Sequence, residues 1–243
     1  HRTARDFAAA GVRVAAVIDV REDAPVTGDW PTYAGAQVIA TKGRMALREI
    51  TIRTASGAEE KIATDCLAVS GGWNPTLHLT CHLNGRPTWR EDIAAFVPVP
   101  GMVPGLEAVG AANGSMSTTA ALAEGLAGAG AALQALGLKT AKLDLPQAEN
   151  GGTRLQAFWQ VTEAKGRAWL DLANDVTTKD VRLAAQEGFR SVEHMKRYTT
   201  QGMAPDQGKN SNVAALAVLA DATGRGISDT GLTTFRPPYV PVS

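Results

Sequence analysis

Polar side chains gather in one short window of the sequence, between two segments with helical spacing. The window contains, in order, Lys196, Arg197, Thr199, Thr200, Gln207 and Lys209. Its loop leads into a further helical segment, so backbone N–H groups at a helix N-terminus lie beside hydroxyl and ammonium groups. This combination favours an anion, and we expect a phosphate group as the ligand. The alternative is that the basic residues form a solvated helix face and the threonines are helix caps.

Three helices are predicted to position this loop. Thr177, followed by Asp180, is typical of a helix start, and Gly188 is typical of a helix end. Ser191 can cap a second helix, which we expect to end at Gly202. The third helix has the spacing of a buried face at Val213, Leu216, Ala217 and Ala220.

The first twenty residues have the pattern of a dinucleotide-binding fold. Residues 2–10 predict a helix that ends at Gly11, and the nearly continuous apolar run 12–20 predicts a buried parallel strand. Asp19 stands at the end of that strand, where an acidic residue accepts hydrogen bonds from a ribose in such folds. An ordinary surface aspartate is the alternative. The glycine loop that usually comes first would precede His1, so we expect a piece of a longer polypeptide.

Two later segments also predict close approach of the backbone to a ligand. Residues 37–62 alternate like antiparallel strands, and we expect them to form a small inserted sheet. An apolar strand over residues 65–70 then runs into Gly71 and Gly72, which have no side chains to hold a ligand away.

A strand, a turn of small residues and a long helix follow in the region 106–136. The strand is expected over 106–109 and the turn over 110–114, and Ser115, Ser117 or Thr118 can cap the alanine-rich helix. This order resembles the second ligand-contacting element of flavin and pyridine-nucleotide oxidoreductases, where a helix N-terminus faces a pyrophosphate. A βα corner without a ligand is the alternative.

Composition excludes several classes of partner and site. Hydrophobic residues make up 44% of the 243, and 24 basic residues balance 24 acidic ones, so we expect neither nucleic acid nor a membrane surface as partner. Cys66 and Cys81 are too few for a disulfide framework and favour a reducing cytoplasm. His78, Cys81 and His82 lie close in sequence, but a structural zinc site needs a second such cluster. We therefore expect no metal.

The predicted organisation has three parts. Residues 1–138 form the C-terminal portion of a dinucleotide-binding domain, 139–157 a linker rich in proline, asparagine and glycine, and 158–243 a small helical domain. Consecutive prolines force the segment 233–239 to be extended.

Three long segments carry a resemblance to a known family. They are LAVSGGWNPTLHL at 67–79, EGFRSVEHMKRYTTQGMAPDQGK at 187–209 and TTFRPPY at 233–239. With them the chain resembles the central part of the alpha subunit of heterotetrameric sarcosine oxidase. The resemblance implies an α/β fold, in which part of a Rossmann-like FAD/NAD(P)-binding domain with a small antiparallel insert precedes a helical domain. That helical domain is similar to iron–sulfur domains of the bacterioferritin-associated-ferredoxin type.

The resemblance also implies an activity and its cofactors. Enzymes of this family oxidise sarcosine with a flavin that oxygen re-oxidises, giving glycine, hydrogen peroxide and formaldehyde or methylene-tetrahydrofolate. The alpha subunit binds NAD and carries a folate domain further along. The beta subunit holds FAD, covalent FMN lies at the alpha–beta interface, and gamma and delta subunits complete the complex. Because oxidation occurs on the beta subunit, no catalytic residue is expected here.

Site residues follow from the resemblance position by position. The nucleotide-binding segments contain Asp19, Gly71, Gly72, Trp73, Gly110 and Asn113. The positions of the cluster cysteines hold Asp171, Ala173, Asp206, and Ser211 or Asn212 instead. Without thiolates no cluster can be ligated. We expect the loop with Thr199, Thr200, Gln207 and Lys209 to face the phosphate of the interface FMN instead.

Two alternatives remain open. One is a related oxidase or dehydrogenase complex that acts on another secondary or N-methylated amine. The other is a non-catalytic assembly module in which NAD is structural. Since the substrate pocket would lie on a partner chain, the sequence does not choose between them.

Overall fold

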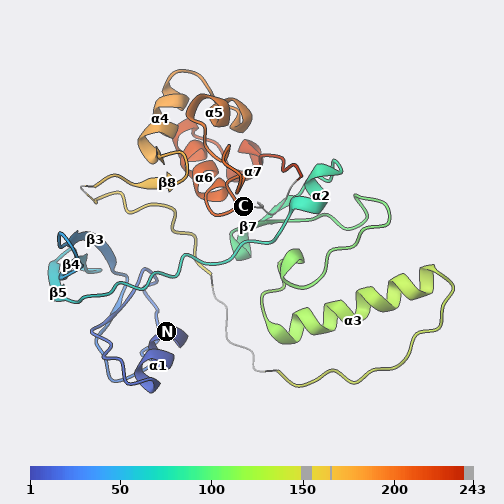
Figure 1. Ribbon diagram of the computed structural model, residues 1–243, viewed down its shortest axis with the longest axis horizontal. Coiled ribbons are helices and arrows are strands. Elements are labelled where there is room, and N and C mark those ends of the chain that lie inside the picture. The colour runs from blue at the N-terminus through green and yellow to red at the C-terminus, as the bar shows by residue number, and fades with distance from the viewer. Residues whose placement is uncertain (149–154, 165, 238–243) are drawn as a thin grey trace. The chain divides into compact units, whose positions relative to one another are not determined.

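The computed structural model describes residues 1–148, 155–164 and 166–237 (Figure 1). Contacts divide the chain into two compact units, residues 1–71 with 158–169 and residues 72–157 with 170–243. The expected linker residues Asn150, Gly151 and Gly152, and Pro238 and Tyr239 of the expected extended tail, lie outside the described residues. The boundaries expected at 138 and 157 stay a prediction.

The first unit begins with a helix and a parallel strand pair. Helix α1 covers Arg2–Ala9, and β1 (Val17–Asp19) pairs in parallel with β2 (Thr32–Ala34). The helix, the parallel strand and the position of Asp19 at its end are confirmed. The strand is shorter than the apolar run 12–20, because β2 offers only three residues for pairing.

An antiparallel meander completes this unit, as the alternating pattern predicted. Strands β3 (Gln37–Lys42), β4 (Glu49–Arg53) and β5 (Glu59–Ala63) pair in sequence order. Ile50 and Ile52 of the central strand are buried, while the alternate residues 49, 51 and 53 are half-buried, which is the two-residue period of a sheet with one covered face. Arg53 forms an ion pair with Glu59 within the meander and another with Glu163 of segment 158–169.

Two predicted strands are wrong. Residues 65–70 and 106–109 have no strand structure. A strand is stabilised by hydrogen bonds to a neighbour, and no described strand pairs with either segment. An apolar run therefore indicates residues that favour burial. It does not indicate whether a neighbouring strand is available to pair with them.

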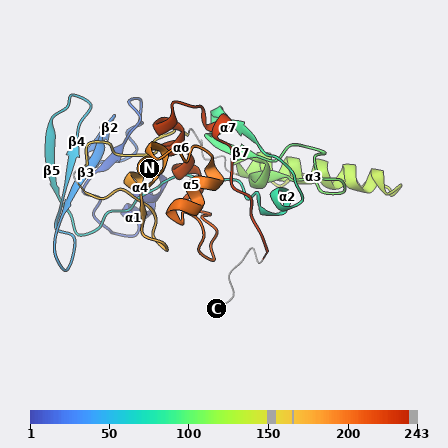
Figure 2. The ribbon, with the colours of Figure 1, turned by 90° about the horizontal axis from the view of Figure 1, so that it is seen from above.

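The second unit contains a short helix, a strand pair and a long helix before its helical module. Helix α2 covers His78–His82, and β6 (Thr88–Arg90) pairs with β7 (Ala95–Val97) across the 3-10 turn η1 (Glu91–Ile93). A second 3-10 turn, η2 (Gly110–Asn113), precedes α3 (Thr118–Ala135). Neither view shows another helix or strand running alongside α3 (Figures 1 and 2).

The helical module has the three helices that the sequence predicted, and a short fourth helix that it did not. A strand pair, β8 (Trp169–Asp171) and β9 (Val176–Thr177), leads into α4 (Thr178–Gln186), α5 (Val192–Thr199), α6 (Asn212–Thr223) and α7 (Ile227–Thr230). The start signals are confirmed, because Thr177 and Asp180 form a capping box and the Ser191 hydroxyl accepts the N–H of His194. The predicted end of α5 at Gly202 is wrong: Thr200 is the left-handed residue that ends it, with φ +64°.

The core of this unit centres on α6. Val181, Met195, Leu216 and Leu219 are fully buried, and Phe235 of the tail packs against them. Leu77, Cys81 and Phe96, which precede the module by many residues, belong to the same core. The α2–β7 region and the helical module therefore share one hydrophobic interior. No described helix is both long and apolar enough to cross a membrane.

Candidate functional site

The turn before α3 is organised around one carboxylate. Glu124 accepts hydrogen bonds from the backbone N–H of Gly110 (2.5 Å), the Nδ2 of Asn113 (3.2 Å) and the hydroxyl of Ser115 (2.9 Å). Gly110 has φ +66°, and a Cβ at this position would lie 3.3 Å from that of Ala121. The turn therefore needs a glycine for its backbone conformation and packs tightly on the helix.

Helix α3 brings Glu124 to the turn. Ser117 caps the helix, since its hydroxyl accepts the N–H of Ala120, as one of the predicted caps. Side chains on a helix lean toward its N-terminus, so a glutamate in the second turn reaches back over the residues before the cap. Burial raises the pKa of Glu124, but the bonds from Ser115, Gly110 and Asn113 outweigh burial and lower the pKa below its usual value. The carboxylate is ionised at neutral pH.

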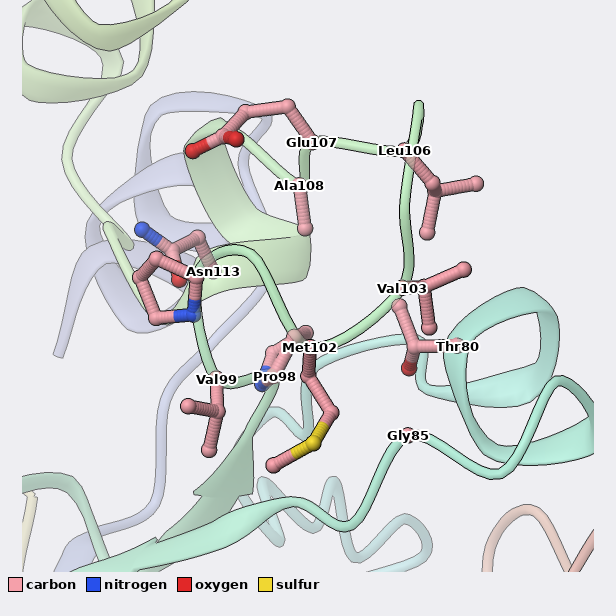
Figure 3. A pocket seen from close by; sticks show the side chains of 11 residues that line it. Thr80, Gly85, Pro98, Val99, Met102, Val103, Leu106, Glu107, Ala108 and Asn113 are labelled. Atoms are coloured by element: carbon pink, nitrogen blue, oxygen red, sulfur yellow. The ribbon is translucent and has the colours of Figure 1, made fainter.

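Asn113 also lines a small hollow (Figure 3). The wall comprises the loop residues that follow β7, including Glu107 and Ala108, together with Thr80 and Gly85. Its enclosed volume is about 10 Å³, which is room for about one water molecule. The hollow is thus a surface feature beside the turn and not a pocket that could enclose a nucleotide.

Asp19 is fully engaged within the first unit. Its Oδ1 accepts the backbone N–H and the Nε–H of Arg21, and its Oδ2 lies 2.5 Å from the Nη2 of Arg21 and 2.8 Å from the Nε2 of His1. The Arg21 side chain lowers the pKa of Asp19, and burial only partly opposes it. A ribose at this carboxylate would share it with Arg21 or displace it, so the predicted contact stays a prediction.

The glycine pair lies on open backbone. Gly72 has φ +89°, which accounts for a glycine there, while a Cβ on Gly71 would meet no atom within 4 Å. Trp73, the next residue, is 74% exposed. No described residue of the chain would clash with a side chain at Gly71. A ligand that approaches the backbone there would be a reason for a glycine.

The two threonines of the α5–α6 loop donate their hydroxyl hydrogens within the chain. Thr199 donates to the carbonyl of Met195 (2.9 Å), and Thr200 donates to that of Thr199 (2.5 Å). The Nδ2 of Asn174 in turn donates to the carbonyl of Thr200. A phosphate accepts hydrogen bonds, so these hydroxyls would have to exchange their present acceptors to contact one.

Gln207 clasps the tail. Its Nε2 donates to the carbonyl of Arg236 (2.6 Å), and its Oε1 accepts the N–H of the same residue (2.8 Å). Lys209 lies near His78: burial lowers the pKa of that histidine, and the positive charge of Lys209 lowers it further. In the loop expected to bind phosphate, Gln207 thus binds the tail, and Lys209 lies close to the buried, neutral imidazole of His78.

Two of the positions that resemble cluster ligands, Asp171 and Asn212, lie beside the same residue, Gly202. The carboxylate of Asp171, 3% exposed, accepts the N–H groups of Ala173, Asn174 and Gly202. A Cβ on Gly202 would lie 2.6 Å from the Oδ1 of Asn212. Asp171 binds the N–H of Gly202, and Asn212 packs against the same glycine.

Metal ligands are not assembled in the described part of the chain. No group of three histidine, cysteine, aspartate or glutamate side chains could hold an ion there. His78 stacks on Phe235 with ring centroids 4.3 Å apart, and burial raises the pKa of Cys81. Both side chains pack in the core, and Cys66 is a free, exposed thiol.

The sequence did not single out Glu124 as a site residue. It was not considered because its three donors lie 9 to 14 residues away in the chain. A signal did exist: a single acid in an otherwise apolar, alanine-rich helix is costly unless it has partners. The nearest candidates are the polar residues of the preceding turn.

Comparisons with known proteins connect these features to one family. The chain is 43% identical to the sarcosine oxidase subunit alpha of Rhizobium meliloti (strain 1021), over 99% of the chain and 24% of the relative. The chain is homologous to sarcosine oxidase alpha subunits. Residues 165–243 match the family described as the sarcosine oxidase A3 domain. The resemblance expected from the sequence is confirmed.

Other relatives set the extent of the match. The alpha subunit from Corynebacterium sp. (strain P-1) is 36% identical over 98% of the chain and 27% of its own length. The chain thus spans about a quarter of the curated relatives. The crystal structure of L-proline dehydrogenase from P. horikoshii superposes with a TM-score of 0.63 over 88% of this chain and 44% of that one, at 19% identity. A mixed α/β fold is shared.

Proposed function

We propose that the chain is the central part of the alpha subunit of a flavin-dependent sarcosine oxidase complex. The complex would convert sarcosine to glycine, with hydrogen peroxide and formaldehyde or methylene-tetrahydrofolate as the other products. The observation that carries this proposal is the 43% identity over 99% of the chain. Two free cysteines favour a cytoplasmic complex.

The chain would serve the complex by binding NAD. Three observations support this role: Asp19 ends a parallel strand, Gly71 has open space where a side chain would be, and Gly110 and Asn113 form a glycine-dependent turn before α3. Gly72 and Trp73 belong to the same set of proposed nucleotide-binding residues. The N-terminus of α3 favours negative charge, which supports a phosphate near this turn, although the donors of Gly110, Asn113 and Ser115 now bind Glu124. Bound NAD would supply hydride-transfer chemistry.

The α5–α6 loop would face FMN at the interface with the beta subunit. Lys209 provides a positive charge beside the N-terminus of α6, and this is the feature that fits a flavin phosphate. Thr199, Thr200 and Gln207 now bond within the chain, so their first role is to shape and anchor the loop. FAD would belong to the beta subunit and folate to a further domain, with gamma and delta subunits completing the assembly.

Reconstitution of the whole complex tests the activity. The full alpha subunit is co-expressed with its partner subunits, and hydrogen peroxide is measured with sarcosine and with other secondary or N-methylated amines. We expect sarcosine to give the highest kcat/KM. A higher value with another amine would assign the complex to a related reaction.

The cofactor roles have separate tests. NAD released on denaturation of the purified complex would support the nucleotide site, and failure of added NADH to reduce the flavins would make that NAD structural. For the flavin, the Thr200→Ala/Lys209→Ala double variant is expected to retain less FMN than Lys139→Ala, which removes an exposed lysine elsewhere. Equal FMN content in the two would contradict the FMN-facing loop.

A further inference from the structure

We propose that acid releases the described part of the tail, residues 231–237: the tail stays docked while His78 is neutral and leaves when this buried imidazole takes up a proton. The tail follows α7 and runs past α2, the helix that contains His78 (Figure 1). This device does not depend on any of the cofactors proposed above, because only residues of this chain take part in it.

Side chains, and not secondary structure, hold the tail in place. Among the described residues, those after Gly231 make no backbone–backbone hydrogen bond and belong to no helix or strand. Instead, the Thr233 hydroxyl accepts the side-chain amide at the start of α6, Phe235 packs in the core, and Gln207 binds the backbone of Arg236. A segment held in this way can open locally while the helices stay folded.

His78 lies beneath the tail. The centroid of its ring is 4.3 Å from that of Phe235, and the two rings are tilted by 55°. His78 is 9% exposed and Phe235 is also buried, so each ring helps to exclude water from the other. Opening of the tail therefore removes part of the cover of the imidazole and lets water reach it.

The docked tail disfavours a protonated His78. Burial lowers the pKa of His78, and the positive charge of Lys209, in the loop before α6, lowers it further. On the same helix, burial raises the pKa of Cys81, so that its thiol is neutral, and His82 is exposed. The tail itself contributes a cation, Arg236, and no acid. None of these groups supplies a negative charge to an imidazolium.

The direction of the pH effect follows from proton linkage. The pKa of His78 is lower in the docked state than in the opened state, so opening takes up a proton at any pH between these two values. Docking is strongest above about pH 6.5, the ordinary pKa of histidine, and weakens as pH falls toward the lower, docked pKa. Uptake of one proton raises the opened fraction about tenfold for each pH unit within that window.

Hydrogen exchange in the full alpha subunit tests the acid release. Exchange is followed by mass spectrometry from about pH 7.5 to about pH 5 in the peptide that contains the Arg236 amide, whose hydrogen binds Gln207. Each rate is divided by the intrinsic rate at the same pH. We expect the protection of this amide to fall about tenfold per pH unit below about pH 6.5, while peptides of the buried helix α6 keep theirs.

Three variants separate His78 from a general effect of acid. His78→Phe keeps a ring beside Phe235 but takes up no proton, so protection of the tail should become independent of pH. His82→Gln removes the exposed histidine of the same helix and should keep the wild-type slope. Lys209→Met removes the neighbouring charge, which brings the docked pKa of His78 closer to its ordinary value and should narrow the acid-dependent window.

Each contrary outcome overturns the acid release. One is wild-type protection of the tail that does not change with pH, and another is a His78→Phe variant that keeps the wild-type slope. A loss of protection in α6 parallel to that in the tail would mean that acid unfolds the whole unit. If His78→Phe does not fold, the wild type and Lys209→Met still decide, because equal windows in these two proteins would exclude His78 as the group that titrates.

Discussion

Helices α6 and α3 have similar apolar compositions and opposite surroundings. Seven of the twelve residues of α6 are buried, whereas none of the eighteen residues of α3 is. Helix α6 contacts α4 and α7, and its buried side chains share a core with those of α5 and α2. Helix α3 contacts mainly the turn that precedes it. One region therefore completes its hydrophobic contacts, and the other keeps leucines such as Leu122 and Leu126 half-covered.

The difference shows what each region contributes. A helix that is apolar on all sides is stable in water only when its surface is covered. The helical module and the α2–β7 region supply that cover together, within one core. Helix α3 has a fixed N-terminal turn, through Glu124, but an open body. We expect its cover to come from outside this chain.

The largest expected effect comes from truncating a leucine in each helix. Leu219→Ala in α6 removes a fully buried side chain and should lower the free energy of unfolding by about 2–5 kcal/mol. Leu126→Ala in α3 should lower it by less than about 1 kcal/mol in the isolated chain, because the site is already half-exposed. Denaturant unfolding of both variants measures this. Equal losses would remove the distinction between the two helices.

A glycine pair within the helical module tests how tightly its loop is packed. Gly202→Ala forces a left-handed residue and brings a Cβ 2.6 Å from the Oδ1 of Asn212, so we expect a loss of about 3 kcal/mol. Gly188→Ala has the same conformational strain, but no atom lies within 4 Å of its Cβ, and it should cost about 1 kcal/mol. If both cost the same, the contact with Asn212 is not part of the packing.

The next effect is on the acid stability of the module. Burial raises the pKa of Asp171, but the N–H of Gly202 and the bonds from Asn174 and Ala173 outweigh it and lower the pKa below 3.8. The folded state therefore gains stability that is fully present above about pH 4 and is lost as pH falls through the lower, folded pKa. Asp171→Asn should flatten this dependence and cost about 1–2 kcal/mol at pH 7.

The matching comparison for Asp171 uses a carboxylate with neutral donors in the other region. The pKa of Glu124 is also lowered, so Glu124→Gln should flatten a similar acid transition. The free energy of unfolding of each variant, measured between pH 6 and pH 2.5, shows how much of the acid dependence each carboxylate contributes. No change in the acid limb for Asp171→Asn would mean that this carboxylate does not hold the loop to β8.

The smallest effect is a gain. Thr200 is β-branched and has φ +64°, a conformation that costs such a residue about 1 kcal/mol or more. Thr200→Gly should therefore raise the free energy of unfolding by about 1 kcal/mol, measured by the shift in Tm. Thr199→Gly is the control, since Thr199 is helical and should lose stability. A loss of stability in Thr200→Gly would mean that the threonine hydroxyl matters more than the strain.

Local sequence signals predicted the helical module well. Elements that depend on a distant pairing partner were predicted less well. Thr177 with Asp180 and Ser191 lie within three residues of the groups that they cap, so the sequence alone contains both sides of each interaction. The strands expected over 65–70 and 106–109 depend on neighbours that an apolar run does not reveal. The same limit explains the errors at single residues, where Thr200 and not Gly202 ends α5.

The candidate site shows this limit more clearly. The family and the turn at 110–114 followed from residue patterns, and so did the position of Asp19 at a strand end. The hydrogen-bond partners could not be predicted from these patterns. Asp19 binds Arg21, Asn113 binds Glu124, and Gln207 binds the backbone of the tail. A sequence predicts which groups are able to bind, and the fold decides which of them already have partners.

The clasp between Gln207 and the tail has a consequence for which substitutions the tail can accept. Both bonds go to the backbone of residue 236, so the arginine side chain there is not part of the attachment. Almost any amino acid can replace it, with proline as the exception, because the ring removes the hydrogen that the amide oxygen binds. Pro237 begins one residue later. Moving that proline back by a single position would remove one of the two hydrogen bonds to Gln207 and leave the composition unchanged.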